Sequence, residues 1–229
     1  MKNLILSLFA VLVLAASCSK KKELVEEINK QEILAKKIKD IIPPAYLDSL
    51  KKLGLTINTD FNPPNIEGIY LVTPFIMAST SVPNDRVKVG DKFLDGKVQF
   101  NGQTSDFDIK LLGRNLLHDR DTSMVTAIAG SGNDFTVYGK VKSTSGAKSA
   151  IFAIIISATK DGNTFKNFKM GIINVDNSKG GTGTFIAEGT GRVAYDKDLI
   201  SESITETQFL SFGRDKVIRG DINYLGAPK

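Results

Sequence analysis

The stretch "SAIFAIIISATKDGNTFKNFKMGIINV", Ser149–Val175, decides the fold of this chain of 229 residues. Two runs rich in Ile, Phe and Val flank the dipeptide Asp161-Gly162. A tight hairpin turn prefers Asp-Gly because glycine adopts a positive φ without a steric penalty. The stretch therefore predicts two long antiparallel strands joined by a short turn.

The first run of this hairpin does not alternate between apolar and polar residues. Ala150, Phe152, Ile154 and Ile156 point to one face of a strand, and the residues between them, 151 to 155, are equally apolar. By contrast, "FTVYGKVK", residues 135–142, alternates as a strand does with one dry and one wet face. The strand at 150–159 therefore needs cover on both faces.

The rest of the chain after residue 54 has the same texture of short Val, Ile, Phe, Thr and Tyr runs between turn residues. Eight strands are predicted: Gly68–Met77, Lys97–Asn101, Ser105–Leu112, Met124–Ala129, Asp134–Lys142, Ala150–Thr159, Thr164–Val175 and Gly183–Ala194. Short connections favour a mainly β antiparallel meander, and eight strands suffice to close a small barrel. A partly open barrel and a two-layer sandwich fit the same strand count.

An amphipathic segment, "ELVEEINKQEILAKKIKDII", precedes the strands at residues 23–42. Its apolar residues recur at helical spacing, and Pro43 and Pro44 end the helix because proline lacks the amide donor. A second helix is predicted from Pro44 to Gly54, which supplies the C-terminal cap. We expect the helical segment 23–54 to cover the outer face of the 150–159 strand; a membrane or partner surface, or an oligomer interface for that strand, are the alternatives.

The N-terminus has the build of a secretory signal peptide, with Lys2 ahead of the apolar run "LILSLFAVLVLAA". The run is too short to span a bilayer. Ala15-Ala16-Ser17-Cys18 resembles the lipobox of bacterial lipoproteins, which implies cleavage after residue 17 and attachment of acyl chains to the thiol of Cys18, the only cysteine. Residues 18–22, with Lys20 to Lys22, would then form a lipidated tether.

Apart from the lipobox motif, the sequence resembles two protein families. The segment "NPPNIEGIYLVTPF", Asn62–Phe75, together with "GNDFTVYGKV", Gly132–Val141, is similar to a family of uncharacterised Bacteroidota-type envelope lipoproteins. Gly68-Ile69-Tyr70 distantly resembles the Gly-x-aromatic element of lipocalin-like barrels. The first resemblance implies a location in the cell envelope and lends no functional residue; the second implies a barrel formed by residues 55–229.

Charge and composition argue against nucleic acid as a partner of this protein. Once Lys2 is removed, 29 basic residues stand against 25 acidic ones, a mild excess without the aromatic-interleaved basic patches of nucleic-acid binding. The resemblance implies the outer membrane of a Gram-negative envelope. Surface-exported Bacteroidota-type lipoproteins tend to carry acidic residues soon after the cysteine, whereas here Ser19 and three lysines come first, so we expect the domain to face the periplasm. No cofactor is expected.

Residues that carry chemistry are few. His118, the only histidine, lies in "NLLHDRD" with Asp119 and Asp121, and one imidazole with two carboxylates lacks the ligands that zinc requires. We therefore expect an exposed loop, no metal site and no catalytic residue. The glycine-rich "NSKGGTGTF", Asn177–Phe185, lacks the P-loop lysine, and the triplet Arg219-Gly220-Asp221 is too short to carry weight.

Two classes of function fit these features. One is a membrane-anchored lipoprotein that binds a small hydrophobic ligand inside the barrel, where Phe135, Val137, Phe152 and Ile154 would line a cavity. The other is an interaction or structural lipoprotein that supports another envelope protein without a ligand pocket. The same four residues would then be plain core, which is the interpretation we favour.

Overall fold

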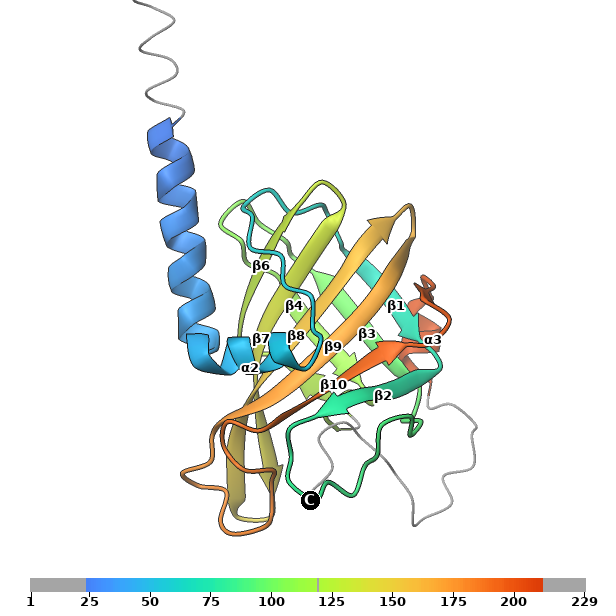
Figure 1. Cartoon of the computed structure of the whole chain (residues 1–229). Coiled ribbons are helices and arrows are strands. Elements are labelled where there is room, and N and C mark those ends of the chain that lie inside the picture. Colours follow the sequence, from blue (N-terminus) through green and yellow to red (C-terminus); the bar gives the residue numbers. More distant parts are fainter. Residues whose placement is uncertain (1–23, 119, 212–229) are drawn as a thin grey trace, which may run out of the picture.

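A computed structural model describes residues 24–118 and 120–211, and the fold is mainly β with antiparallel sheets and an N-terminal helix, as predicted. Helix α2 and the segment after it lie across one face of the long strands (Figure 1). The larger sheet has the strand order β2 (Phe75–Thr80), β10 (Gly191–Asp196), β9 (Thr164–Asp176), β8 (Lys148–Asp161), β7 (Asp134–Ser145) and β6 (Val125–Ser131), with β11 (Ile200–Ser201) paired to β9. The smaller sheet has the order β1 (Gly68–Val72), β3 (Gly96–Asn101), β4 (Lys110–Arg114) and β5 (Asp121–Thr122).

The predicted hairpin is present as β8 and β9, with Gly162 at φ +54° in the turn. Three predicted strands need correction. The strand at 68–77 is two strands in different sheets, because the chain changes sheet at Pro74, which has no amide donor for a ladder. The strand at 105–112 begins only at Lys110, after a bend at Phe107, and the strand at 183–194 begins only at Gly191, after positive-φ turns at Gly183 and Gly189.

The two sheets face each other across one apolar interior. Backbone bonds join their margins. On one side the Ile128 amide donates to the Phe107 carbonyl (2.9 Å), and on the other the Leu71 amide donates to the Glu202 carbonyl (2.9 Å) and the Ile204 amide to the Ile69 carbonyl (2.9 Å). Within the described residues the ladders form two separate sheets, so the predicted single meander holds only from β6 to β10 and within β3 to β5.

Aromatic rings fill the space between the sheets. The Phe165 ring stacks on Tyr70 of the smaller sheet at a centroid distance of 3.7 Å and lies 4.8 Å from Phe135 and 6.2 Å from Phe100. All four residues named as cavity or core positions, Phe135, Val137, Phe152 and Ile154, are buried in this core. They pack against other side chains as core residues do.

The outer face of the larger sheet is covered by α2 (Pro44–Lys52), which lies against β9 and β10, and by the segment that follows it, which reaches β8. Leu50 and Leu55 pack against Gly171, where a Cβ atom would lie only 2.8 Å from Leu55 Cδ2. A larger residue at position 171 would have to displace the Leu55 side chain, so glycine permits this close crossing. Ser157 donates to the Thr56 carbonyl (2.5 Å), which fixes the segment on the same face.

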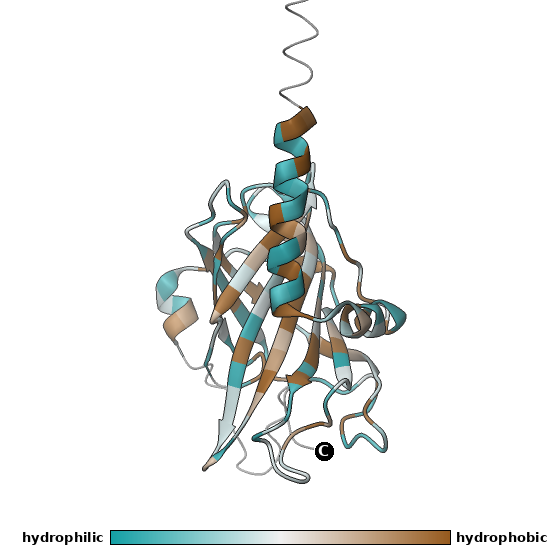
Figure 2. Cartoon of the chain, turned by 90° about the vertical axis from the view of Figure 1, so that its left-hand side faces the viewer, coloured by the Kyte–Doolittle hydropathy of each residue, from teal (hydrophilic) through white to brown (hydrophobic). Residues whose placement is uncertain are grey.

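The N-terminal helix (residues 24–41) is docked only at its C-terminal end. Leu34, Ile41 and Ile42 are buried, whereas Leu24, Val25 and Ile28 are exposed. Figure 2 shows apolar residues at the free end of this helix, beyond the sheet. The outer face of the larger sheet is therefore covered by α2 and the segment after it, and the base of the first helix lies beside β7.

Replacing Leu50 with alanine should lower the free energy of unfolding by about 2–5 kcal/mol, because it opens a cavity between α2 and the sheet. Leu24→Ala is the matched control in the same helical region and should change stability by less than about 0.5 kcal/mol, since Leu24 is exposed. Urea denaturation of both variants measures the difference. Equal, small effects would show that α2 is not an integral part of the fold.

Candidate functional site

An apolar groove lies beside the N-terminal helix. Its volume is about 440 Å³. One wall is the helix and α2, and the other is the extended segment at Thr59–Phe61. The lining residues are mostly aliphatic or aromatic: Gln31, Leu34, Ala35, Ile38, Lys39, Ile42, Pro44, Leu47, Thr59, Asp60 and Phe61.

Hydrogen bonds to β6 hold the extended wall in place. The Gly130 amide donates to the Asp60 carbonyl (2.7 Å), and the Asn62 amide donates to the Gly130 carbonyl (2.9 Å). Asn58 is bound one step earlier, where its amide donates to Thr136 Oγ1 (2.8 Å). Phe61 is thus presented to the groove by a segment that is fixed to the larger sheet.

The helical wall is held by contacts at its C-terminal half. Lys37 Nζ lies 2.5 Å from Asp108 Oδ1, and the Lys140 ammonium donates to the Asp40 carbonyl. Burial of Leu34 adds an apolar contact one turn away. Both walls therefore rest on the same sheet, which makes the groove a preformed feature rather than a gap between independent parts.

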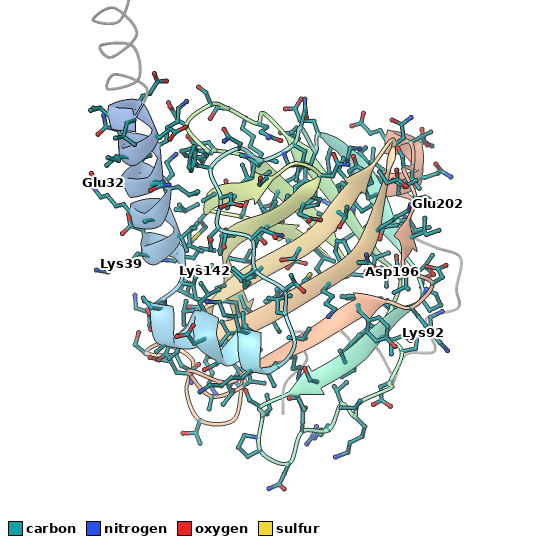
Figure 3. All side chains as sticks on the ribbon, turned by 45° about the horizontal axis from the view of Figure 1, so that its top comes forward. Glu32, Lys39, Lys92, Lys142, Asp196 and Glu202 are labelled. Carbon is teal, nitrogen blue, oxygen red and sulfur yellow. The ribbon has the colours of Figure 1, made fainter. Side chains whose placement is uncertain are left out.

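The chemistry of the groove is that of an apolar site with a polar margin. Lys39 and Asp60 supply the only charged side chains among the lining residues, and Lys39 lies with Glu32 on the helix away from the sheet (Figure 3). A volume of this size falls within the range of small-molecule sites, which bind through apolar surface and use few polar groups for orientation. The groove can accept an aliphatic or aromatic group of modest size.

His118 occupies a second constellation that the sequence did not predict. His118 Nδ1 lies 3.2 Å from Asp121 Oδ1, and His118 Nε2 lies 2.8 Å from Ser143 Oγ. The Asp121 carboxylate is buried and accepts a further bond from the Leu117 amide (2.9 Å). The prediction of an exposed loop is therefore wrong for Asp121, whose buried carboxylate accepts bonds from the loop. Asp119 lies outside the described residues.

A serine, a histidine and an aspartate linked in this way by hydrogen bonds are also found in acyl-transfer enzymes, in which the serine hydroxyl must reach a substrate carbonyl. Ser143 is 2% exposed on the inner face of β7, so its hydroxyl is closed to substrate in this structure. The three side chains instead hold His118 and Asp121 against β7. No local motif reveals this arrangement, because Ser143 lies 25 residues from His118 in the sequence.

The remaining predicted features contribute no site. Cys18, Lys20 to Lys22 and the triplet at 219–221 lie outside the described residues. The glycine-rich stretch at 177–185 is a loop without a helix, and Lys148 Nζ donates to Thr184 Oγ1 (2.9 Å) across it. Residues 24–118 and 120–211 contain no group of three or more His, Cys, Asp or Glu side chains that could hold a metal ion. In the same ranges no helix is both long and apolar enough to cross a membrane.

Two buried carboxylates, one on β10 and one beside it, have pKa values shifted in opposite directions. Burial tends to raise the pKa of Asp85, but Arg192 donates from Nη2 (2.6 Å) and Nε (2.8 Å), and the net effect is a lowered pKa. For Asp196, burial raises the pKa to about 7, and the neighbouring Asp198 carboxylate adds to the shift. Ser201 donates to Asp196 Oδ2 (2.7 Å) and opposes it only in part.

Comparison of the chain with protein-family models, with curated proteins and with solved structures gives no match.

The raised pKa of Asp196 predicts a pH dependence of stability. The folded state binds a proton at Asp196 more tightly than the unfolded chain, so this group lowers the free energy of unfolding as pH rises from 3.8 to about 7. Asp196→Asn, which stays neutral, should flatten the pH profile of the melting temperature in this window. The exposed Asp106→Asn is the control and should leave the profile unchanged. An unaltered slope in Asp196→Asn would contradict the assignment.

Proposed function

We propose that this protein is a lipid-anchored lipoprotein of a Gram-negative envelope that binds a small hydrophobic ligand in the groove beside its N-terminal helix. The observation that carries the proposal is the groove itself, which has apolar walls fixed to one sheet and a volume of about 440 Å³. Ligand sites of this size are generally preformed and largely apolar.

The packed interior between the two sheets favours a ligand site in the groove rather than between the sheets. Phe165, Tyr70 and Phe135 are in ring contact there, and the surrounding side chains are buried against one another. A ligand in this space would have to displace packed core side chains, each worth several kcal/mol of stability. The groove needs no such displacement.

We also propose that the two sheets together form a lipocalin-like barrel. The bonds from Ile128 to Phe107 and from Leu71 to Glu202 support it, because they connect the margins of the two sheets on both sides. In this description the barrel is a filled scaffold and the ligand lies on its outer surface. The scaffold then serves to hold the two walls of the groove at a constant separation.

The proposed anchor is Cys18, and the proposed location is the periplasmic face of the outer membrane. The lipobox-like Ala15-Ala16-Ser17-Cys18 after an apolar run supports the anchor. Two or three acyl chains hold a protein far more firmly than one, since each buried methylene contributes about 0.8 kcal/mol. The run Lys20 to Lys22 after the cysteine supports retention on the periplasmic side.

An interaction lipoprotein is the second candidate, because an apolar segment of another envelope protein would fit the same groove. The two candidates differ in what remains bound after purification. A stoichiometric small hydrophobe in native mass spectrometry of protein from its own host supports the first, and a co-purifying envelope protein supports the second.

The anchor predicts a modified N-terminal peptide. Mass spectrometry of the native protein should find the chain beginning at Cys18 with added acyl mass, and Cys18→Ala should move the protein from the membrane fraction to the soluble fraction. Ser19→Ala is the control, since it leaves the thiol in place. An N-terminal peptide without acyl mass would overturn the anchor.

The groove predicts that filling it blocks ligand. Ala35→Trp places a large ring among the lining residues without removing any core side chain, and it should weaken binding of the probe N-phenyl-1-naphthylamine at least about tenfold, the loss expected for about 1.4 kcal/mol. Lys36→Trp is the matched control, because Lys36 is exposed on the same helix and does not line the groove. Fluorescence titration measures both. Equal affinity in the two variants would exclude the groove as the site.

A further inference from the structure

The N-terminal helix carries apolar side chains that no described part of the chain covers. Leu24, Val25 and Ile28 are 57%, 54% and 47% exposed, in the first turns of the helix. Single exposed apolar residues are common on protein surfaces, whereas three at the free end of one helix form a contiguous surface. Figure 2 shows that this end of the helix extends away from the sheet.

This apolar surface continues the apolar side of the groove. Leu24 and Ile28 belong to a series with alternating spacings of four and three that includes only one polar residue: Leu24, Ile28, Gln31, Ala35, Ile38 and Ile42. Residues with this spacing share one side of an α-helix. Leu34 and Ile41, which dock the helix, lie beside this series, and Ile42 at its end is buried with them. The series is therefore exposed at Leu24 and Ile28 and borders the groove from Gln31 to Ile42.

The position of this surface in the chain identifies what covers it. Six residue steps separate Leu24 from Cys18, and a chain of that length spans at most about 22 Å in any conformation. A bilayer that holds Cys18 through acyl chains is therefore always within reach of the exposed end of the helix. We propose that Leu24, Val25 and Ile28 insert into the surface of that bilayer and give the protein a second, non-covalent membrane contact.

The charges around this surface indicate apolar insertion rather than electrostatic attachment. Lys20 to Lys22 are followed by Glu23, Glu26 and Glu27, so the two signs offset each other. Glu26 also pairs with Lys30 at 3.2 Å. Anionic lipids should then contribute little beyond the attraction of the lysine run.

The contact has a consequence for the groove. Gln31, the first lining residue, follows Ile28 by three residues, or about 4.5 Å along the helix axis. A bilayer at Ile28 lies next to the open end of the groove, so a hydrophobic ligand could pass between them without crossing water. The membrane contact does not depend on such a ligand, and it uses Leu24, Val25 and Ile28, none of which lines the groove.

The chain offers a clean experiment, because it has no tryptophan and one cysteine. The chain from Cys18 to Lys229 is coupled through its thiol to a maleimide phospholipid in vesicles of phosphatidylethanolamine with a minor fraction of phosphatidylglycerol. The coupling supplies the membrane position independently of acylation in the cell, so failure of the proposed anchor and failure of the helix contact are distinguishable. Ile28→Trp is the reporter, and Ile33→Trp is its control.

Ile33 is a matched control because it is 45% exposed on the same helix and lies about 140° around the axis from Ile28. On vesicles the emission of Ile28→Trp should shift to shorter wavelength and be quenched by brominated lipid several-fold more than that of Ile33→Trp. The shift should be absent before coupling. Equal, weak quenching of both reporters would overturn the proposal.

Two further outcomes would also overturn it. A short-wavelength emission of Ile28→Trp without vesicles that is independent of concentration would show that another part of the same chain covers the surface. The same emission rising with protein concentration would show that a second copy covers it. Circular dichroism and melting temperature of both variants confirm that the reporters leave the fold intact.

Discussion

The rest of the structure depends on β8 being buried on both faces. Its inner face, with Phe152, Ile154 and Ile156, closes the interior that the two sheets share. Its outer face would be an apolar surface in water without α2, because Ile155 lies beside Gly171 in the ladder and neither residue is polar. The helices are therefore required by the strand, and the absence of a side chain at Gly171 determines how closely they approach.

Covering the outer face of the larger sheet also buries polar side chains, and these side chains form hydrogen bonds with one another and with the covering segment. Thr136 and Ser157 lie 2.9 Å apart on neighbouring strands, and each also bonds to the segment between α2 and β1. Tyr138 donates to the Asn58 carbonyl (3.1 Å). A buried polar group without a partner costs about 1–3 kcal/mol, so these bonds specify one path for the segment across the sheet. That path carries Phe61 to the groove.

The N-terminal helix joins two environments. Its C-terminal end is part of the core and forms one wall of the groove, while its first turns have apolar side chains that residues 24–118 and 120–211 leave exposed. In the arrangement that we propose, the docked half of this helix would relate the position of the lipid anchor to that of the domain. We regard the anchor, the exposed end of the helix and the groove as parts of one proposed arrangement at a membrane surface.

The sequence by itself determined the local features of this protein. The apolar runs around Asp161-Gly162, the helix stop at Pro43 and Pro44 and the cap at Gly54 follow from backbone chemistry and periodicity within a few residues. The composition of β8 also predicted that both of its faces must be covered. Tertiary structure alone decided that residues 68–77 divide between two sheets, that Ser143 meets His118, and that Phe61 faces Leu34 and Ile38 across a groove. Periodicity reports which side of an element is apolar, whereas the choice of distant partner depends on packing between segments that share no local signal.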